Sequence, residues 1–302
     1  MSAASVAHAL GGARKEGHGW RCQCPLHGGR SLMLSDGHGG RLLAWCFGGC
    51  DAREVLAELR HRGLFDGRGQ DCAQSEAVTS RRDSAHAANR SMRALAIWRE
   101  SRPAPGTIVT KYLESRGITA GALPAQLLQK LRYHSHCPHP TGAQLPAMVS
   151  LVEHVEHGPV AVHRTYLRPD GAGKACINPN KASLGPVGGG AVRFGPLVLS
   201  QSLAIAEGLE TAVSVHQATG LPTWAGPSAG GIESLMLPSH PLATEVTIFA
   251  DHDVNGRGQQ AADKAAARWH AEGRQVRLAL PPMPGADFND VLQASEAAEG
   301  AA

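Results

Sequence analysis

Hydrophobic and polar residues have their clearest rhythm in the last third of the chain. From about residue 200, short apolar runs such as SLAIAEG and EVTIFAD alternate with longer amphipathic runs such as ETAVSVHQATG and GRGQQAADKAAARWHAEG. The short runs predict strands and the longer runs predict helices. Strands that alternate with helices are typical of a parallel sheet covered by helices on both faces. We therefore expect an α/β domain over residues 200–294, followed by a disordered polar tail over residues 295–302.

The pattern near the N-terminus differs and predicts a small unit over residues 1–65. Two strand-like runs, SLMLSD and RLLAWC, flank the turn GHGG and predict a β-hairpin. The next segment, DAREVLAELRHRGL, predicts a helix with Asp51 as its N-cap and Gly63 after its end. Trp45 lies in the second strand of the hairpin, and we expect it to pack in the core.

Two further segments lie between these units. Residues 66–90 contain almost no large apolar side chain, which favours a linker. Residues 91–199 predict helices over 91–100 and 110–116, and then two adjacent strands, AMVSLVEHV and PVAVHRTYL, of a β-rich region. The stretch 169–190, rich in Gly and Pro, predicts a loop.

Charge is distributed unevenly along the chain. Lys and Arg outnumber Asp and Glu by 24 to 14 over residues 1–199, whereas Asp and Glu outnumber Lys and Arg by 12 to 5 over residues 200–302. A basic N-terminal part and an acidic C-terminal part are typical of a protein that binds a polyanion with one part and divalent cations with the other. No apolar run reaches the ~20 residues that span a membrane. The first residues lack the apolar core of a secretory signal, so we expect a cytoplasmic protein without a membrane partner.

The cysteines of the first 65 residues indicate a metal site. Two close pairs flank the predicted hairpin, and they consist of Cys24, His27, Cys46 and Cys50. Zn²⁺ takes four nitrogen and sulfur ligands in a tetrahedron, usually as two such pairs. With all four positions filled by the protein, the zinc would be structural. Cys22 is the nearest rival to Cys24, and free thiols in a small β unit are the plain alternative.

Acidic residues follow the predicted strands of the last domain. Glu207 ends SLAIAEG, Asp251 and Asp253 end EVTIFADHD, and Asp287 and Asp290 lie in GADFNDVL. In an open parallel sheet, ligands bind beyond the carboxyl ends of the strands, so these carboxylates should converge. Mg²⁺ and Mn²⁺ are commonly held by a few carboxylates together with substrate phosphates. A single acid at a strand end is more often a helix cap, but several together favour a metal site.

These residues also carry a resemblance to a known family. The segments IAEGLETA, FADHDVNGRGQQAA and GADFNDVL resemble the three motifs of the Toprim domain, which bacterial primases share with topoisomerases and some nucleases. The cysteine unit resembles the zinc-binding module of bacterial, plasmid and phage primases. The middle segment, with LPAMVSLV and VAVHRTYLRPDG, resembles the region before Toprim in primase-like proteins of mobile elements. The ordered set resembles a Toprim DNA primase of the plasmid, phage or mobile-element kind.

The resemblance implies a fold and an activity. The fold would be a Rossmann-like Toprim sheet behind a β-rich middle region and a zinc-ribbon-like module. The activity would be synthesis of short RNA primers from NTPs on a single-stranded DNA template. By resemblance, catalytic Mg²⁺ or Mn²⁺ would be held by Glu207, Asp251 and Asp253, with Asp287 joining them. The sequence departs from the replicative primases at Thr211, where they carry a second acid, and Glu210, one residue earlier, is the candidate to substitute for it.

Other expectations concern substrate, partner and competing functions. Four basic residues lie just before the Toprim segment and are candidates for NTP binding, although each is also a plausible surface cation: Arg164, Arg168, Lys174 and Lys181. No Gly-x-x-x-x-Gly-Lys-Ser/Thr motif is present, so unwinding is expected from a separate helicase. A Toprim nuclease would use the same acids, and a non-catalytic DNA-binding accessory protein would keep the fold alone. A topoisomerase fits worst, because it needs a nucleophilic tyrosine on a further domain.

Overall fold

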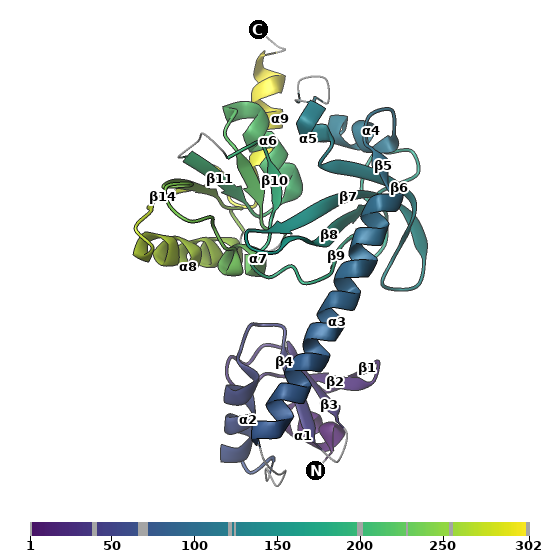
Figure 1. Cartoon of the computed structure of the whole chain (residues 1–302), viewed down its shortest axis with the longest axis vertical. Helices are drawn as coiled ribbons and strands as arrows, with labels where there is room; N and C mark the ends of the chain where they lie inside the picture. Colours follow the sequence, from purple (N-terminus) through teal and green to yellow (C-terminus); the bar gives the residue numbers. More distant parts are fainter. Residues whose placement is uncertain are drawn as a thin grey trace. The chain divides into compact units, whose positions relative to one another are not determined.

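The computed structural model describes residues 2–37, 41–65, 72–119, 123, 125–197, 202–227, 229–253 and 256–299. The chain divides into two compact units, which we call the N-terminal unit (Met1–Ser80) and the C-terminal unit (Arg81–Ala302). We describe each unit by itself (Figure 1). In the described part of the chain, no helix is both long and apolar enough to cross a lipid bilayer.

The N-terminal unit contains a four-stranded antiparallel sheet in the order β1-β2-β3-β4. Its elements are α1 (Ala3–Leu10), β1 (Arg14–Glu16), β2 (Gly19–Cys22), β3 (Leu32–Asp36), β4 (Leu42–Cys46) and α2 (Ala52–His61). The predicted hairpin is confirmed as β3–β4, although its turn at 38–40 lies outside the described residues. Helix α2 begins as predicted, because Asp51 accepts a hydrogen bond from the Arg53 N–H at 2.7 Å. Val55 and Leu59 of α2 are buried against the sheet.

The predicted linker is largely helical. Helix α3 runs without interruption over Cys72–Glu100, so it includes most of residues 66–90 as well as the helix expected at 91–100. Residues 72–100 contain no Gly or Pro, and their Ala, Arg, Gln and Glu residues favour a helix even without an apolar face. The polar composition was therefore a poor guide to backbone structure here. Residues 66–71 lie outside the described residues.

The first part of the C-terminal unit is a five-stranded antiparallel sheet, ordered β5-β6-β7-β8-β9. Its elements are β5 (Arg102–Pro103), α4 (Ile108–Glu114), α5 (Ala125–Leu128), β6 (Leu131–Pro138), β7 (Gln144–His154), β8 (Gly158–Tyr166) and β9 (Lys181–Leu184). The two predicted strands are confirmed as the neighbours β7 and β8. The expected loop 169–190 is only partly a loop, because β9 pairs with β8 inside it. Its four residues, KASL, alternate only weakly between exposed and half-buried positions, which gives little sequence signal.

The second sheet of the C-terminal unit has the order β10-β12-β11-β13-β14. Its elements are β10 (Val192–Phe194), β11 (Ser202–Ala206), α6 (Leu209–Thr219), β12 (Thr223–Ala225), α7 (Ala229–Ser234), β13 (Glu245–Phe249), α8 (Arg257–Ala271), β14 (Gln275–Ala279) and α9 (Phe288–Glu299). Strands β12, β11, β13 and β14 are parallel, as predicted, and β10 joins them antiparallel. The expected tail from residue 295 is wrong as far as Glu299, because α9 continues to that residue; residues 300–302 lie outside the described residues.

Helices cover both faces of this sheet, as predicted. Leu203 and Ile205 of β11 pack in one core with α7 and α8, where Trp269 is fully buried. Ala206 at the end of the same strand packs in the other core, with α6. That second core also contains Met148 of the antiparallel sheet, so residues 91–199 and 200–294 share one interior.

Candidate active site and metal centres

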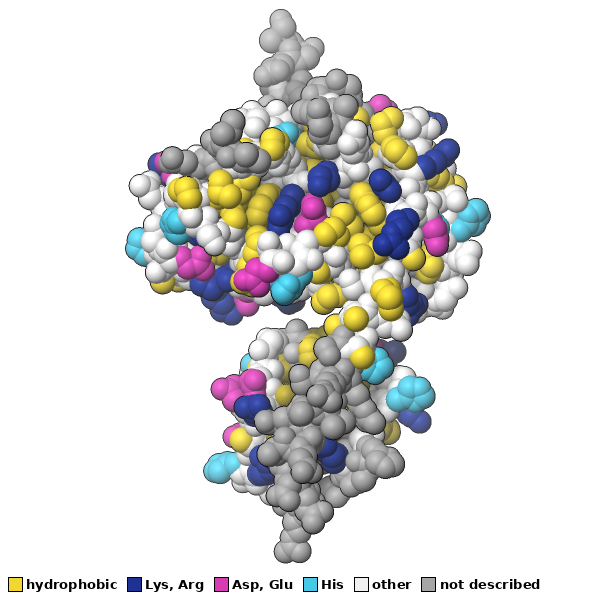
Figure 2. Space-filling model, in the orientation of Figure 1, with side chains coloured by type: hydrophobic (Ala, Val, Ile, Leu, Met, Phe, Trp, Pro, Cys, Tyr) yellow, Lys and Arg dark blue, Asp and Glu magenta, His cyan; other side chains and the backbone are white. Residues whose placement is uncertain are grey.

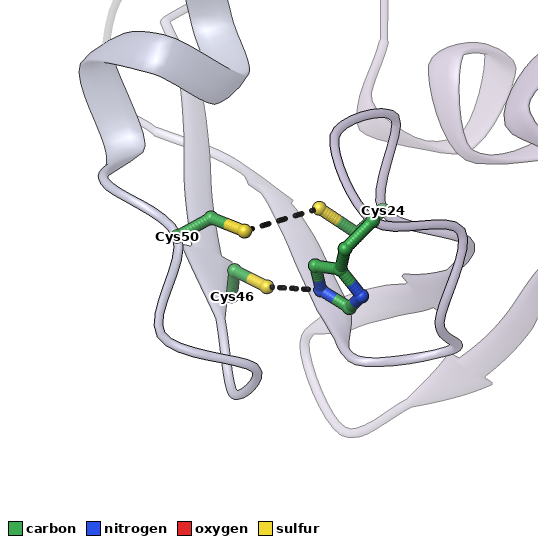
Figure 3. Close-up of side chains that lie close together, drawn as sticks. Cys24, Cys46 and Cys50 are labelled. Atoms are coloured by element: carbon green, nitrogen blue, oxygen red, sulfur yellow. Dashed lines mark hydrogen bonds between the residues drawn. The ribbon is translucent and has the colours of Figure 1, made fainter. Parts of the chain in front are cut away.

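The four predicted zinc ligands come together in the N-terminal unit. Cys24 and His27 lie in the turn after β2, Cys46 ends β4, and Cys50 lies just before α2. The Cys24 and Cys50 sulfurs are 3.8 Å apart, and His27 Nε2 is 3.2 Å from Cys46 Sγ (Figure 3). All four ligand atoms lie within 4.8 Å of one another. Ligands about 2.3 Å from a tetrahedral Zn²⁺ would be separated by ~3.8 Å, so this donor set fits zinc.

Cys22, the rival ligand, lies outside this cluster. Strand residues alternate between the two faces of a sheet, and Cys22 points into the core, where it is fully buried. Its sulfur is not among the four ligand atoms that lie within 4.8 Å of one another. Gly48 completes the pocket, because its N–H donates to Cys46 Sγ at 3.3 Å. A Cβ at Gly48 would lie only 2.6 Å from His27 Nε2.

The predicted acids meet at the carboxyl ends of two adjacent parallel strands. Ala206 of β11 pairs with Phe249 of β13, so Glu207 and Asp251 follow neighbouring strand ends. Gly258 in the first turn of α8 marks their convergence. A Cβ there would lie 3.3 Å from Glu207 Oε2 and 3.2 Å from Asp253 Oδ2. Glu207 and Asp253 therefore both approach Gly258, a residue that the sequence analysis did not single out.

Asp251 has the most unusual environment of these acids. Burial, followed by the charges of Glu207, Asp287 and Asp253, raises the pKa of its carboxyl to about 7. Its Oδ1 is buried without a hydrogen-bond partner. A buried carboxylate oxygen with no donor, surrounded by other carboxylates, is an unfavourable arrangement unless a cation completes it. The residues present therefore fit a divalent cation.

The acids are more widely spaced than the zinc ligands. Among the described residues, three or more possible ligand atoms lie within 4.8 Å of one another in two places only: the cysteine–histidine cluster, and His154, Glu156 and His157 at the β7–β8 turn. An open carboxylate site is typical of Mg²⁺, which keeps water and substrate phosphates in its coordination shell.

Asp287 also makes hydrogen bonds at the start of α9. Its Oδ1 accepts the Asp290 N–H at 2.9 Å, and Asp290 Oδ2 accepts the Asp287 N–H at 3.0 Å. Such reciprocal bonds cap a helix N-terminus. Asp287 Oδ2 also lies 3.8 Å from an Arg116 nitrogen. Both oxygens of Asp287 thus have partners, while its charge still acts on Asp251.

Glu210 does not replace the acid missing at Thr211. It is 4% exposed, and its Oε1 accepts the Tyr112 hydroxyl at 2.5 Å and lies 3.0 Å from Lys174 Nζ. Burial by itself raises the pKa of Glu210, but Lys174, Lys181 and Tyr112 outweigh it and hold the pKa at about 2. Glu210 is therefore a buried, ionised carboxylate that joins α6 to the antiparallel sheet.

The four basic candidates differ in their surroundings. Arg164 is a correction to the sequence analysis: it is 5% exposed, and its guanidinium donates to the backbone oxygens of three residues, Pro138, Ala182 and Ser183. Arg164 therefore links segments of the antiparallel sheet and is not available to bind a nucleotide. Arg168 is exposed and paired with Asp170 at 2.7 Å. Lys174 pairs with Glu210, and Lys181 on β9 is exposed and acts electrostatically on Asp251.

Trp45 is a second correction, because it is 66% exposed and not in the core. Paired residues across the sheet place it in one row with Arg14, Arg21 and Met33. Side chains of directly paired residues share a face, so this row is basic at one end and aromatic at the other. The alternation along β4 indicates this exposure: Leu42 and Cys46 are buried, and Trp45, directly before Cys46, points to the opposite face of the sheet.

A second basic and aromatic surface lies on the C-terminal unit. A depression of about 310 Å³ beside α4 is lined in part by Arg102, Lys111 and Tyr133. The Arg102 guanidinium carbon lies 5.1 Å from the centre of the Tyr133 ring. Figure 2 shows Lys and Arg side chains, with hydrophobic ones among them, on the face of this unit that carries α4 and strands β5–β8. Sequence reasoning did not find this depression.

Comparison with known proteins agrees with the C-terminal architecture. Residues 202–298 match a family model described as a Toprim domain, and residues 88–194 match one described as a domain of unknown function (DUF7146). None of the curated proteins matches the chain. The C-terminal part of the chain is thus a Toprim domain.

Similar solved structures include primases. The zinc-binding and RNA polymerase domains of Aquifex aeolicus primase are 15% identical, with a TM-score of 0.45, over 99% of this chain and 81% of that one. A DnaG primase catalytic domain bound to single-stranded DNA is 15% identical, with a TM-score of 0.45, over 72% and 81%. The primase fragment of the bacteriophage T7 primase-helicase is 14% identical, with a TM-score of 0.38, over 60% and 69%.

Proposed function

We propose that this protein is a DNA primase that makes short RNA primers from NTPs on single-stranded DNA. The observation that carries the proposal is the acidic site itself. Asp251, with its orphaned buried oxygen and raised pKa, lies with Glu207 and Asp253 at the end of a Toprim sheet. The cluster of three cysteines and one histidine on the same chain is a separate support.

Each part of the site has a task in this proposal. Glu207, Asp251 and Asp253 hold Mg²⁺ or Mn²⁺, with Asp287 close by. The metal would stabilise the charge on the α-phosphate and activate the attacking 3′-hydroxyl. The charge of Lys181 acts on Asp251, and Lys174 pairs with Glu210, three residues after Glu207; together with the exposed Arg168 these lysines would bind the triphosphate. Arg164 has no direct part.

The template would be held by the basic and aromatic surfaces. Bases stack on exposed aromatic rings while phosphates bind Lys and Arg, whatever the sequence. Trp45 with Arg14 and Arg21 offers this combination on the zinc-containing unit, and Tyr133 with Arg102 offers it near α4. A separate plasmid, phage or host helicase would supply the single strand.

The test is primer synthesis by the purified protein with single-stranded DNA, labelled NTPs and Mg²⁺ or Mn²⁺. We expect short RNA ladders that disappear in Asp251→Asn/Asp253→Asn. Asp263→Asn, on the exposed side of α8, is the matched control and should keep the ladder. Shortened template without a ladder would instead establish a Toprim nuclease. Binding of DNA with neither product, under conditions where the protein is loaded with metal, would favour an accessory protein.

A further inference from the structure

Glu210 lies where three separate segments of the C-terminal unit meet. The carboxylate comes from the first turn of α6, three residues after Glu207. Tyr112 reaches it from α4, and Lys174 reaches it from the segment between β8 and β9. Because Glu210 is almost fully buried, a charged partner there is worth far more than an ion pair at the surface.

The segment that carries Lys174 is also fixed on its other side. Gly171 has a φ of +76°, and a Cβ there would lie 2.9 Å from the Ile108 carbonyl oxygen of α4. The Arg168 N–H donates to the Gly173 carbonyl at 2.9 Å, which closes the turn before Lys174. The turn is therefore packed onto α4, and the ion pair of Lys174 with Glu210 fixes the end of the turn to α6.

Lys181 extends this arrangement to the metal-binding acids. Its charge lowers the pKa of both Glu210 and Asp251, so it lies within electrostatic reach of the two carboxylates. Lys181 pairs with Thr165 across β8 and β9, while Lys174 lies at the entry to the same hairpin. Glu210 thus binds one lysine directly, and a second lysine acts on it through charge.

We propose that Glu210 is a positioning residue for nucleotide binding: its buried carboxylate fixes Lys174, and with it the β8–β9 segment and Lys181, at the distance from the acidic site that a triphosphate needs. It touches neither metal nor substrate. The inference rests on the proposed primase function, since a triphosphate is the ligand that both lysines and the metal would share. This role also explains why the chain has an acid at position 210, although Thr211 stands at the position where replicative primases carry their second acid.

The test compares Glu210→Gln with Tyr112→Phe. The first keeps the shape and the tyrosine contact but loses the charge that holds Lys174. The second removes the other contact of the same oxygen and leaves the ion pair between Lys174 and Glu210 in place. Thermal unfolding, KM for NTP, kcat, and the affinity for a fluorescent ATP analogue in Ca²⁺ are measured for each. We expect kcat/KM to fall by about 10- to 100-fold in Glu210→Gln, mostly through KM and analogue affinity.

Tyr112→Phe should keep the wild-type KM and analogue affinity even if its melting temperature falls. Glu210→Asp, which keeps the charge on a shorter arm, should recover part of the loss. If both variants lose stability and nucleotide affinity in parallel, Glu210 is structural and the inference is wrong. If KM in Glu210→Gln is unchanged while the wild type makes primers, the inference fails and the proposed function stands. A wild type that binds the analogue but makes no primers overturns the proposed function, while the effect of Glu210 on nucleotide affinity is still measured.

Discussion

The backbone N–H of Gly258 donates to Asp253 Oδ2 over 3.2 Å, and this contact brings the first turn of α8 against the acidic site. A helix N-terminus favours nearby negative charge, so α8 helps to hold the carboxylate of Asp253 in place. A side chain at 258 would lie within 3.3 Å of both Glu207 and Asp253. The absence of a side chain at this one residue is therefore part of how the acids converge.

Gly258→Ala should impair metal binding without unfolding the protein. Alanine is favoured over glycine in a helix by about 1 kcal/mol, which offsets part of the steric cost. The added Cβ would displace Glu207 or Asp253 by a few tenths of an ångström, so we expect Mn²⁺ affinity and priming to fall by about tenfold or more. Isothermal titration with Mn²⁺ measures the first and the primer ladder the second. Gly188→Ala is the control, because a Cβ there meets open space; equal effects of the two substitutions would contradict this prediction.

The raised pKa of Asp251 gives the metal-free protein a defined pH dependence. The folded pKa, about 7, lies above the ordinary value of 3.8, so the folded state binds the proton more tightly than the unfolded state. Stability from this group is therefore greatest below pH 4 and is lost as the pH rises toward 7. Denaturant unfolding at several pH values, without chelator and without added Mg²⁺ or Mn²⁺, should show this decline, and Asp251→Asn should flatten it. Mn²⁺ should restore stability at pH 7 and above, and a wild type with no decline would argue against the buried, crowded carboxylate.

The sequence was sufficient for those parts of the molecule in which local pattern and spacing carry the information. Two Cys/His pairs around a hairpin predicted the Cys/His cluster that the structure contains, and acids after neighbouring parallel strands predicted that carboxylates lie together beyond the sheet. Contacts between segments that are distant in the chain could not be predicted from the sequence. Nothing local in the sequence indicates that Glu210 meets Tyr112, 98 residues away, or that Arg164 is used up by backbone carbonyls. The exposed Trp45 was misjudged because large aromatic residues are usually buried, although its own strand alternation pointed outward.

The zinc ligands predict a unit that depends on metal for folding. The N-terminal unit has a small core, and structural zinc contributes on the order of 10 kcal/mol in units of this kind. Cys50→Ser should therefore abolish zinc binding and the protection of residues 1–65 from proteolysis. Cys22→Ala should keep one zinc per chain and lose only the stability of a core side chain, about 1–3 kcal/mol. Exposed Cys176→Ser should change neither. Atomic absorption and limited proteolysis give the readouts; loss of zinc in Cys22→Ala would reassign the ligand.

The exposed row on the N-terminal sheet predicts a separate effect on template binding. Trp45 is exposed, so its removal costs the fold little, but a base stacked on an aromatic ring contributes roughly 1–3 kcal/mol. Trp45→Ala should weaken binding of oligothymidylate by about 5- to 150-fold, and Trp45→Phe should recover part of the loss. Arg21→Gln should act differently, because loss of a phosphate contact lowers the salt dependence of binding. Fluorescence anisotropy at several salt concentrations separates the two. Met283→Ala removes a side chain that is 68% exposed on the C-terminal unit and should leave binding unchanged. If it weakens binding as much as Trp45→Ala does, or if Trp45→Ala has no effect, the row does not hold the template.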